Sequence, residues 1–166
     1  MPAVTRIAPF LWFDHQAEEA ANFYVSIFKN SRIVSLSRYP KAGQDEHKMP
    51  EGSLMTVTFE LDGHPFTALN GGPIFHFTEA ISLEVSCDTQ AEIDYYWNAL
   101  SQGGDPKAQV CGWLKDRYGL SWQVVPSVMH ELLADHRSAK ANAAMTAMMK
   151  MKKLDIEALE RAAAAA

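Results

Sequence analysis

The first half of the chain combines short apolar runs with one amphipathic stretch. Residues 6–13 form an apolar run that predicts a strand, and residues 16–28 carry apolar side chains at helical spacing, which predicts a helix. Asp14 stands where the N-cap of that helix is expected. Three further strands are predicted at 31–39, 53–61 and 66–70. Asp62-Gly63 is typical of a hairpin turn, and the polar stretch from Lys41 to Gly52 is expected to be a mobile loop.

The second half repeats this order of elements. Residues 80–87 predict a strand and residues 89–100 a helix, which Thr89 and Glu92 would open with a capping box. Short strands are then predicted at 107–110, 112–115 and 120–125. Beyond Pro126 the composition becomes rich in Ala, Met, Leu and Lys, which predicts only helices.

A five-residue repeat supports a duplication. The residues Asp14-His15-Gln16-Ala17-Glu18 match Asp88-Thr89-Gln90-Ala91-Glu92, and each set follows an apolar run and opens a predicted helix. The apolar stripes of the two helices align better one residue out of step with this match. The sequence therefore predicts an α+β fold of two βαβββ modules, each forming half of one curved mixed sheet.

The module boundaries follow from these patterns. We expect modules at about 4–72 and 78–126, inside a domain spanning 1–137, and a C-terminal helical extension over 138–166. Met145, Met148 and Met149 lie at helical spacing in that extension, and such a stripe is typical of packing, here against a second subunit.

Composition narrows the possible partners and the compartment. The chain has 166 residues, 48% of them hydrophobic, and a net charge of −5, which disfavours nucleic acid and anionic membrane surfaces as partners. No apolar run approaches the roughly 18 residues of a membrane span. The two cysteines, Cys87 and Cys111, lack metal-site spacing and are interpreted as small core residues. We therefore expect a cytoplasmic protein with reduced thiols.

Three segments carry a family resemblance: NGGPIF at 70–75, CGWLKDRYGLSWQVVP at 111–126 and AMMKMKKLDIEALERA at 147–162. The whole chain resembles the PhnB-like branch of the vicinal oxygen chelate superfamily, which includes glyoxalase I, extradiol dioxygenases and the bleomycin- and fosfomycin-resistance proteins. The resemblance implies paired βαβββ modules and a homodimer.

This branch has often carried the label 3-demethylubiquinone-9 3-methyltransferase. A common S-adenosylmethionine enzyme needs a glycine-rich turn after the first strand of a βαβ unit. The corresponding turn here, Phe13 to Gln16, has no glycine. Gly71-Gly72-Pro73 is interpreted as a tight turn between strands, so the sequence gives the label little support.

The superfamily's chemistry implies a divalent metal held by His and Glu side chains in the concave face of the sheet. Carried over by its motifs, the four ligand positions fall on Pro9, Ala68, Ala80 and Gln123. Proline and alanine side chains cannot ligate, and a neutral amide is a poor replacement for a carboxylate. Among the neighbours only Glu79 is a good ligand. We therefore predict no metal and no other cofactor.

Eight residues are candidates for lining a ligand pocket in the same concave face. Gln123 and Asn70 could hydrogen-bond a ligand, although either could instead satisfy buried polar groups. Aromatic side chains would supply apolar walls, with core packing an equal possibility for Trp122. His76 is more simply explained as a solvated loop residue. The full candidate set is Gln123, Asn70, Trp113, Phe59, Phe75, Trp122, His76 and Glu79.

These patterns favour a metal-independent protein that binds a small molecule, and they leave open whether it is an enzyme. One alternative is a metal-dependent lyase, isomerase or dioxygenase using displaced ligands such as Glu79, His76 and Gln123. Another is the labelled quinone methyltransferase, and a fourth is a structural or regulatory dimer with a filled pocket. No motif for an activated Ser or Cys nucleophile is present.

Overall fold

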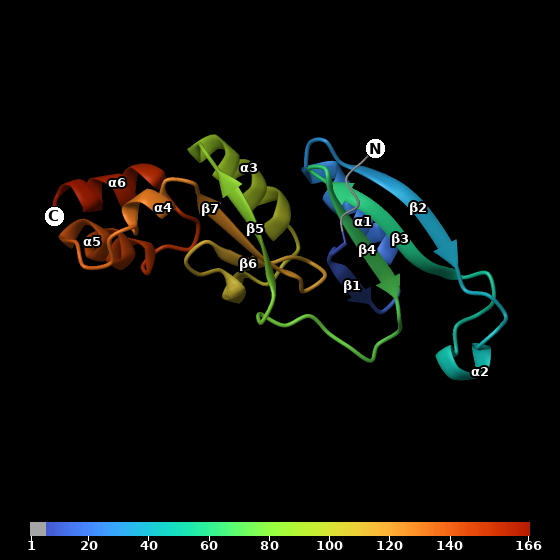
Figure 1. Ribbon diagram of the computed structural model, residues 1–166. Helices are drawn as coiled ribbons and strands as arrows, with labels where there is room; N and C mark the ends of the chain where they lie inside the picture. Colours follow the sequence, from blue (N-terminus) through green and yellow to red (C-terminus); the bar gives the residue numbers. More distant parts are fainter. Residues whose placement is uncertain (1–5) are drawn as a thin grey trace. The chain divides into compact units, whose positions relative to one another are not determined.

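The computed structural model describes residues 6–166, and the α+β class is confirmed. The chain divides into an N-terminal unit ending at His76 and a C-terminal unit from Phe77 to Ala166 (Figure 1). Each unit contains its own mixed β-sheet with a helix against it. Among the described residues, no helix combines the length and apolar character needed to span a membrane.

The N-terminal unit holds a four-stranded sheet in the order β1-β4-β3-β2. Strand β1 runs parallel to β4, and the other neighbours are antiparallel. The predicted helix and strands are confirmed within a few residues at their ends, but the 41–52 stretch contains one short helix. The elements are β1 (Phe10–Phe13), α1 (Ala17–Ile27), β2 (Arg32–Arg38), α2 (Gln44–His47), β3 (Leu54–Leu61) and β4 (His64–Asn70).

Helix α1 buries its apolar stripe against this sheet. Tyr24 is fully buried and stacks on Phe59, which in turn stacks on Phe66. Small alanines at the start of the helix let its backbone approach the strands closely. The core of the N-terminal unit therefore lies between α1 and one face of its sheet.

The start of α1 differs from the prediction. The N-cap is Gln16, without a side-chain capping bond, and the expected cap at Asp14 is wrong. The first helical N–H, that of Ala17, instead donates to Oδ1 of Asn70 at 2.8 Å. Parallel pairing places Phe13 opposite Asn70, so the end of β4 lies beside the start of α1 and supplies the missing acceptor.

The C-terminal unit has a three-stranded sheet in the order β5-β7-β6, with β5 parallel to β7 and β6 antiparallel to it. The predicted strand at 107–110 is wrong. Pro106 and the Asp105 side chain, which accepts from the Lys107 N–H, stabilise a short 3-10 turn there instead. The elements are β5 (Ser82–Cys87), α3 (Gln90–Ser101), η1 (Pro106–Ala108), β6 (Trp113–Lys115) and β7 (Ser121–Pro126).

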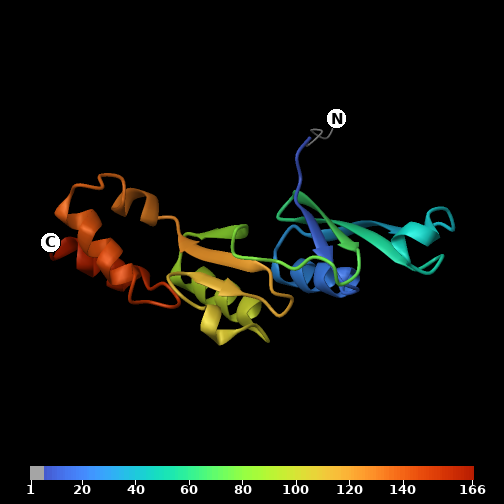
Figure 2. The same ribbon diagram turned by 90° about the horizontal axis from the view of Figure 1, so that it is seen from below.

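Three helices follow β7: α4 (Met129–Leu132), α5 (Ala139–Met148) and α6 (Ile156–Ala164). They form a group after the end of β7 within the C-terminal unit (Figures 1 and 2). Met129, Leu154 and Leu159 form its buried apolar cluster. We refer to residues 127–166 as the C-terminal segment.

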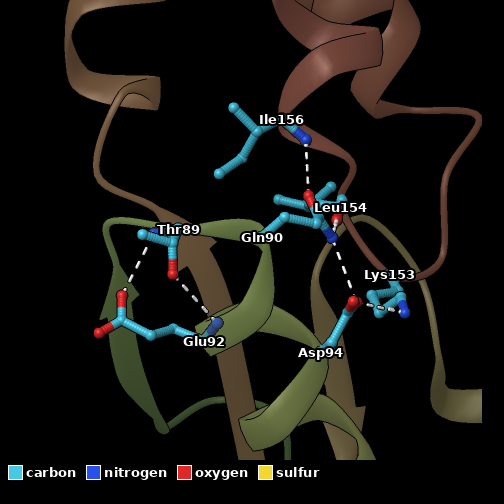
Figure 3. Close-up of polar contacts among 7 residues, drawn as sticks. All are labelled: Thr89, Gln90, Glu92, Asp94, Lys153, Leu154 and Ile156. Carbon is cyan, nitrogen blue, oxygen red and sulfur yellow. Dashed lines mark hydrogen bonds and ion pairs between the residues drawn. The ribbon is translucent and has the colours of Figure 1, made fainter.

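Side chains of α3 hold this segment (Figure 3). Gln90 donates to the Leu154 carbonyl at 3.1 Å and accepts from the Ile156 N–H at 2.9 Å. Asp94 binds both the Gln90 amide and the Lys153 ammonium, the latter at 2.5 Å. Gln90 is thus the central residue of a side-chain network that fixes residues 153–156 to α3.

Two backbone hydrogen bonds attach the same segment to the loop before β6. The N–H groups of Cys111 and Gly112 donate to the carbonyls of Met151 and Lys152 at 2.9 and 2.8 Å. Gly112 has φ +83°, and a Cβ there would come within 3.0 Å of the Leu154 side chain. The left-handed backbone conformation and this close approach both favour glycine at this position.

Candidate functional site

The C-terminal unit contains a cavity of about 920 Å³ that is open to solvent. Its walls come from one face of the β5-β7-β6 sheet, from the loop before β6 and from the C-terminal segment, while the opposite sheet face packs on α3 (Figure 2). The part of the chain up to β7 contributes Glu79, Glu84, Ala108, Val110, Cys111, Trp113, Leu114, Lys115, Ser121, Gln123 and Val125. The C-terminal segment contributes Met129, His130, Leu133, Met148, Met149 and Leu154.

Strand register arranges the sheet side chains in rows. Ser121, Gln123 and Val125 share one face of β7 because side chains alternate along a strand. Glu84 on β5 and Trp113 on β6 are both paired with Gln123, so these three form one row across the sheet. Moving along β7, the rows therefore pass from polar at Ser121 to apolar at Val125.

The polar end of the cavity contains two groups with unused hydrogen-bonding capacity. Ser121 is 1% exposed, and its Oγ has no hydrogen-bond partner within residues 6–166. Gln123 donates from Nε2 to Ser82 Oγ at 2.9 Å, which leaves its Oε1 able to accept. Buried polar groups are normally paired, so the Ser121 hydroxyl is a group at this end of the cavity that still requires a hydrogen-bond partner.

The charges at this end are not balanced within the cavity. Lys115 forms an ion pair with Glu79, and hydrogen bonding from that ammonium, with a backbone bond, lowers the pKa of the Glu79 carboxyl. Glu84 is exposed on the edge strand β5 and forms no ion pair with another described residue. One carboxylate therefore faces the cavity without a cationic partner in the described chain.

The other end of the cavity is apolar and rich in sulfur. Val125 and Met129 line it, together with Met148, Met149 and Leu154. Cys111, predicted to be a core residue, is only half-buried, and its Sγ lies 3.7 Å from Sδ of Met149. Thioether side chains are flexible and polarisable, and suit a wall that adapts to an apolar ligand.

Cys87 behaves as the sequence predicts. It is buried at the end of β5, and burial, with nearby carboxylates, raises the pKa of its thiol to about 11. A thiol of this kind is a poor nucleophile near neutral pH.

Three of the eight candidate pocket residues, Gln123, Trp113 and Glu79, line this cavity. The other five do not. Asn70 is occupied as the acceptor for α1, and it also donates to the Leu54 carbonyl at 3.3 Å. His76 is exposed at the end of the N-terminal unit, which agrees with its interpretation as a solvated loop residue.

The remaining aromatic candidates have other roles. Phe59 belongs to the core under α1, and Trp122 is 2% exposed with its indole N–H donating to Asp116 Oδ2 at 2.8 Å. Phe75 is 62% exposed and makes an edge-to-face contact with Trp12. Of the predicted aromatic walls, Trp113 alone belongs to this cavity.

The sequence analysis did not single out Ser121, Glu84 or the methionine wall. Ser121 lies two residues before Gln123, and strand alternation puts both on one face. Glu84 is a charged residue between the apolar residues Leu83 and Val85. This alternation indicates that Glu84 lies on the face of the strand that does not pack in the core. The methionine wall depends on how the C-terminal segment returns to the sheet, which has no local signal.

The four positions carried over from the superfamily's metal site do not make one. Pro9 precedes β1, Ala68 is fully buried in β4, and Ala80 lies in the loop before β5. Within the described chain, no group of three or more His, Cys, Asp or Glu side chains is placed to hold a metal ion. The donor set does not fit a divalent metal.

Gly71 and Gly72 are explained by packing around Trp12. A Cβ on Gly71 would lie 2.3 Å from the indole ring, and the Trp12 N–H donates to the Gly72 carbonyl at 2.9 Å. Their own N–H groups donate to the carbonyls of Phe13 and Asp14. These glycines therefore close the end of the β1–β4 pair, and they do not form a phosphate-binding loop.

A family comparison covers most of the chain. The sequence model of the family described as 3-demethylubiquinone-9 3-methyltransferase matches residues 5–125. The chain belongs to this family. A PhnB protein from Bacillus cereus is 40% identical, with a TM-score of 0.62, and all of it matches 74% of this chain. The search of curated proteins found no match.

More distant structures show the fold. A protein from Pseudomonas aeruginosa is 20% identical over 74% of this chain and 97% of its own, with a TM-score of 0.55. The fosfomycin resistance protein FosX from Listeria monocytogenes, in complex with Mn(II) and sulfate, is 13% identical over 81% and 98%, with a TM-score of 0.51. The glyoxalase-like fold of this PhnB-like family member is thereby confirmed.

The family match ends at residue 125, whereas the cavity does not. Six lining residues come from the C-terminal segment, beyond the matched region. The sheet side of the cavity thus lies within the region that the family model matches, and the methionine wall lies beyond that region.

Proposed function

We propose that this PhnB-like protein binds a small organic molecule in the cavity of its C-terminal unit, without a metal ion. The observation that carries the proposal is the buried Ser121 hydroxyl without a partner in the described chain, next to Gln123 in a cavity of about 920 Å³. Pockets of roughly 300–1,000 Å³ with apolar walls and a few convergent polar groups are typical of ligand sites.

The cavity would orient such a ligand along β7. A polar group would satisfy Ser121 and the free Oε1 of Gln123, and the apolar body would lie on Val125, Met129 and the methionine wall. Burial of apolar ligand surface would supply most of the affinity, and the polar pair would select the orientation.

Ligand screening by thermal shift and by intrinsic tryptophan fluorescence tests this function. For a compound that binds, Ser121→Ala should weaken binding about tenfold, since a tenfold change corresponds to about 1.4 kcal/mol, the scale of one hydrogen bond. Ser35→Ala is the matched control, because Ser35 is an exposed strand serine on β2 of the N-terminal unit and does not line the cavity. Equal binding by both variants would contradict the proposal.

The metal-dependent alternative finds less support in the donor geometry. Glu79 would have to exchange its ion pair with Lys115 for a metal. Elemental analysis after incubation with Mn, Fe, Ni and Zn tests it directly. Stoichiometric retention that is lost in Glu79→Ala would favour this alternative over metal-free binding.

The methyltransferase alternative rests on the description of the family. Neither sheet is the doubly wound parallel sheet of common S-adenosylmethionine enzymes, and the glycine pair is used for packing around Trp12. Calorimetric titration with S-adenosylmethionine tests it, and saturable binding would favour this activity.

A homodimer and a cytoplasmic location are further parts of the proposal. The segment between the two sheets carries exposed apolar side chains at Ile74 and Ile81, which a second subunit could cover. Light scattering of the purified protein would give twice the mass of the chain if the proposal is right.

A further inference from the structure

We infer that the ligand of this cavity carries an organic ammonium group, bound over Gln123 between Glu84 and Trp113. The inference rests on the proposed binding function of the same cavity and names the class of ligand. It is carried by the charge of the lining, the strand register and the unpartnered hydroxyl of Ser121.

The charges favour a cation. Glu79 and Lys115 neutralise one another, and Glu84 is the other acidic residue of the lining. Glu84 is left as a carboxylate with no ion pair to another described residue. A cationic ligand group would balance this charge, whereas an anionic group would be repelled by it.

The geometry suits an ammonium group. Glu84 and Trp113 lie on the two strands that flank Gln123, and neighbouring strands are about 4.8 Å apart. A group placed above Gln123 is therefore within side-chain reach of both neighbours. The carboxylate would pair with the cation, the Gln123 Oε1 would accept a hydrogen bond, and the indole face would contribute a cation–π contact.

Ser121 adds a further acceptor at this position. Its Oγ is buried in the cavity wall, unpartnered within the described chain, and lies on the same face two residues from Gln123. A primary ammonium has three N–H donors. Glu84, Gln123 and Ser121 together offer three acceptors, so the polar end is complementary to such a group.

The rest of the cavity determines what the ammonium is attached to. Beyond Gln123 the lining turns apolar, from Val125 to Met129, Met148 and Met149. An ammonium on a hydrophobic body fits this gradient along β7. A small inorganic cation would leave the apolar end empty.

Calorimetric titration with three matched compounds at pH 7 tests the inference. The probes are phenylbutylamine, phenylbutanol and phenylbutyrate, which share one apolar body and differ in head-group charge. We expect the amine to bind at least about tenfold more tightly than the alcohol, and the carboxylate to bind most weakly.

The variant Glu84→Gln keeps the shape of the side chain and removes its charge. It should bring amine binding down to the level of the alcohol. Glu160→Gln is the matched control, because Glu160 is exposed on α6 and does not line the cavity. The control should bind all three probes as the unmodified protein does.

The outcomes separate the two proposals. Equal binding of amine and alcohol, or an amine preference that survives Glu84→Gln, overturns the ammonium inference and leaves the binding function intact. Failure of all three probes to bind at millimolar concentration overturns the ammonium inference, and the ligand screen with Ser121→Ala then decides the binding function. Thermal unfolding of each variant confirms that the cavity is still folded.

Discussion

The two units begin their helices with different capping groups, although four of the five residues in the repeat at the two helix starts are identical. In the C-terminal unit, Thr89 and Glu92 form a capping box within the helix itself. In the N-terminal unit, Asn70 reaches across from the end of β4 to the first N–H of α1. One cap is therefore formed locally, and the other forms only once the sheet is assembled.

The comparison also shows which positions of the two helices are equivalent. Counted from their N-caps, the buried positions coincide as Ala20 with Ile93, Tyr24 with Trp97, and Ile27 with Leu100. The five-residue match is one residue out of step with this alignment, as the apolar stripes predict. Core packing thus fixes which positions of the two helices correspond. The polar residues at the helix starts differ in the hydrogen bonds that they form.

The largest difference in unfolding free energy is expected between matched substitutions in two turns. Each turn precedes the last strand of its sheet. Asp116 is 2% exposed and accepts from the N–H groups of Tyr118 and Leu120 and from the indole of Trp122. Asp116→Asn places an amide against the indole donor and should lower the free energy of unfolding by about 2–3 kcal/mol.

Asp62→Asn is the matched change in the β3–β4 turn, where the aspartate is exposed with φ +48°. Asparagine tolerates that conformation, so the change in unfolding free energy should stay within about 0.5 kcal/mol. Urea denaturation measures both variants. Similar losses in the two turns would contradict the role given to Asp116.

The two caps provide the next contrast. Asn70→Ala removes the acceptor for α1 and the bond to Leu54, and should lower the unfolding free energy by about 1.5–2 kcal/mol. Thr89→Ala removes one cap and should lower it by about 1 kcal/mol. Ligand affinity in Asn70→Ala should be unchanged, because Asn70 does not line the cavity. A loss of affinity would show that Asn70 contributes to ligand binding.

The paired glutamines of the repeat test the attachment of the C-terminal segment. Gln90→Ala removes the bonds to Leu154 and Ile156, and should weaken this attachment by about 1 kcal/mol. Limited proteolysis within residues 149–156 should become faster. Gln16→Ala removes one exposed local bond to the His15 N–H and should leave that cleavage rate unchanged.

The smallest expected effect is a loss of folding stability at acidic pH. Hydrogen bonds from Lys153 and then Gln90 lower the pKa of Asp94, and Arg32 lowers the pKa of Glu60 in the N-terminal unit. A carboxyl with a lowered folded-state pKa stabilises the fold above its unfolded pKa of about 4, and this contribution is lost as pH falls below that value.

Both carboxyls are near the surface, so each ion pair should contribute little. The protein should lose stability below about pH 4, and Asp94→Asn should reduce the slope there while leaving stability at pH 7 nearly unchanged. Thermal unfolding across pH 3–7 measures this. A steeper acid slope in the variant would contradict the sign assigned to Asp94.

Much of the fold could be predicted from the sequence because its signals are local. The stripe of α1 and the alternation of β3 and β7 each occupy one short window. The strand expected at 107–110 failed because Asp105 and Pro106 impose a turn that the apolar pattern does not report. At this position, the fixed φ of Pro106 and the Asp105 side-chain bond outweigh the apolar pattern.

The candidate site was only partly predictable. Gln123 and Trp113 stand on strands whose alternation can be read, so their common face could be expected. Asn70 also ends in a side-chain amide, but its partner Ala17 is distant in sequence and the capping bond has no local signal. The opposite wall depends on how Met148 and Met149 return to the sheet, which again only the folded chain shows.

The hydrogen bonds of Cys111 and Gly112 to the carbonyls of Met151 and Lys152 join backbone to backbone. Such bonds do not depend on which side chains the attached segment carries. A segment of different sequence could dock on the same edge and present a different wall to the same sheet. Because Gln90, Asp94 and the buried Leu154 also hold the segment, an exchanged segment would keep the two backbone bonds and would have to supply its own side-chain contacts to α3.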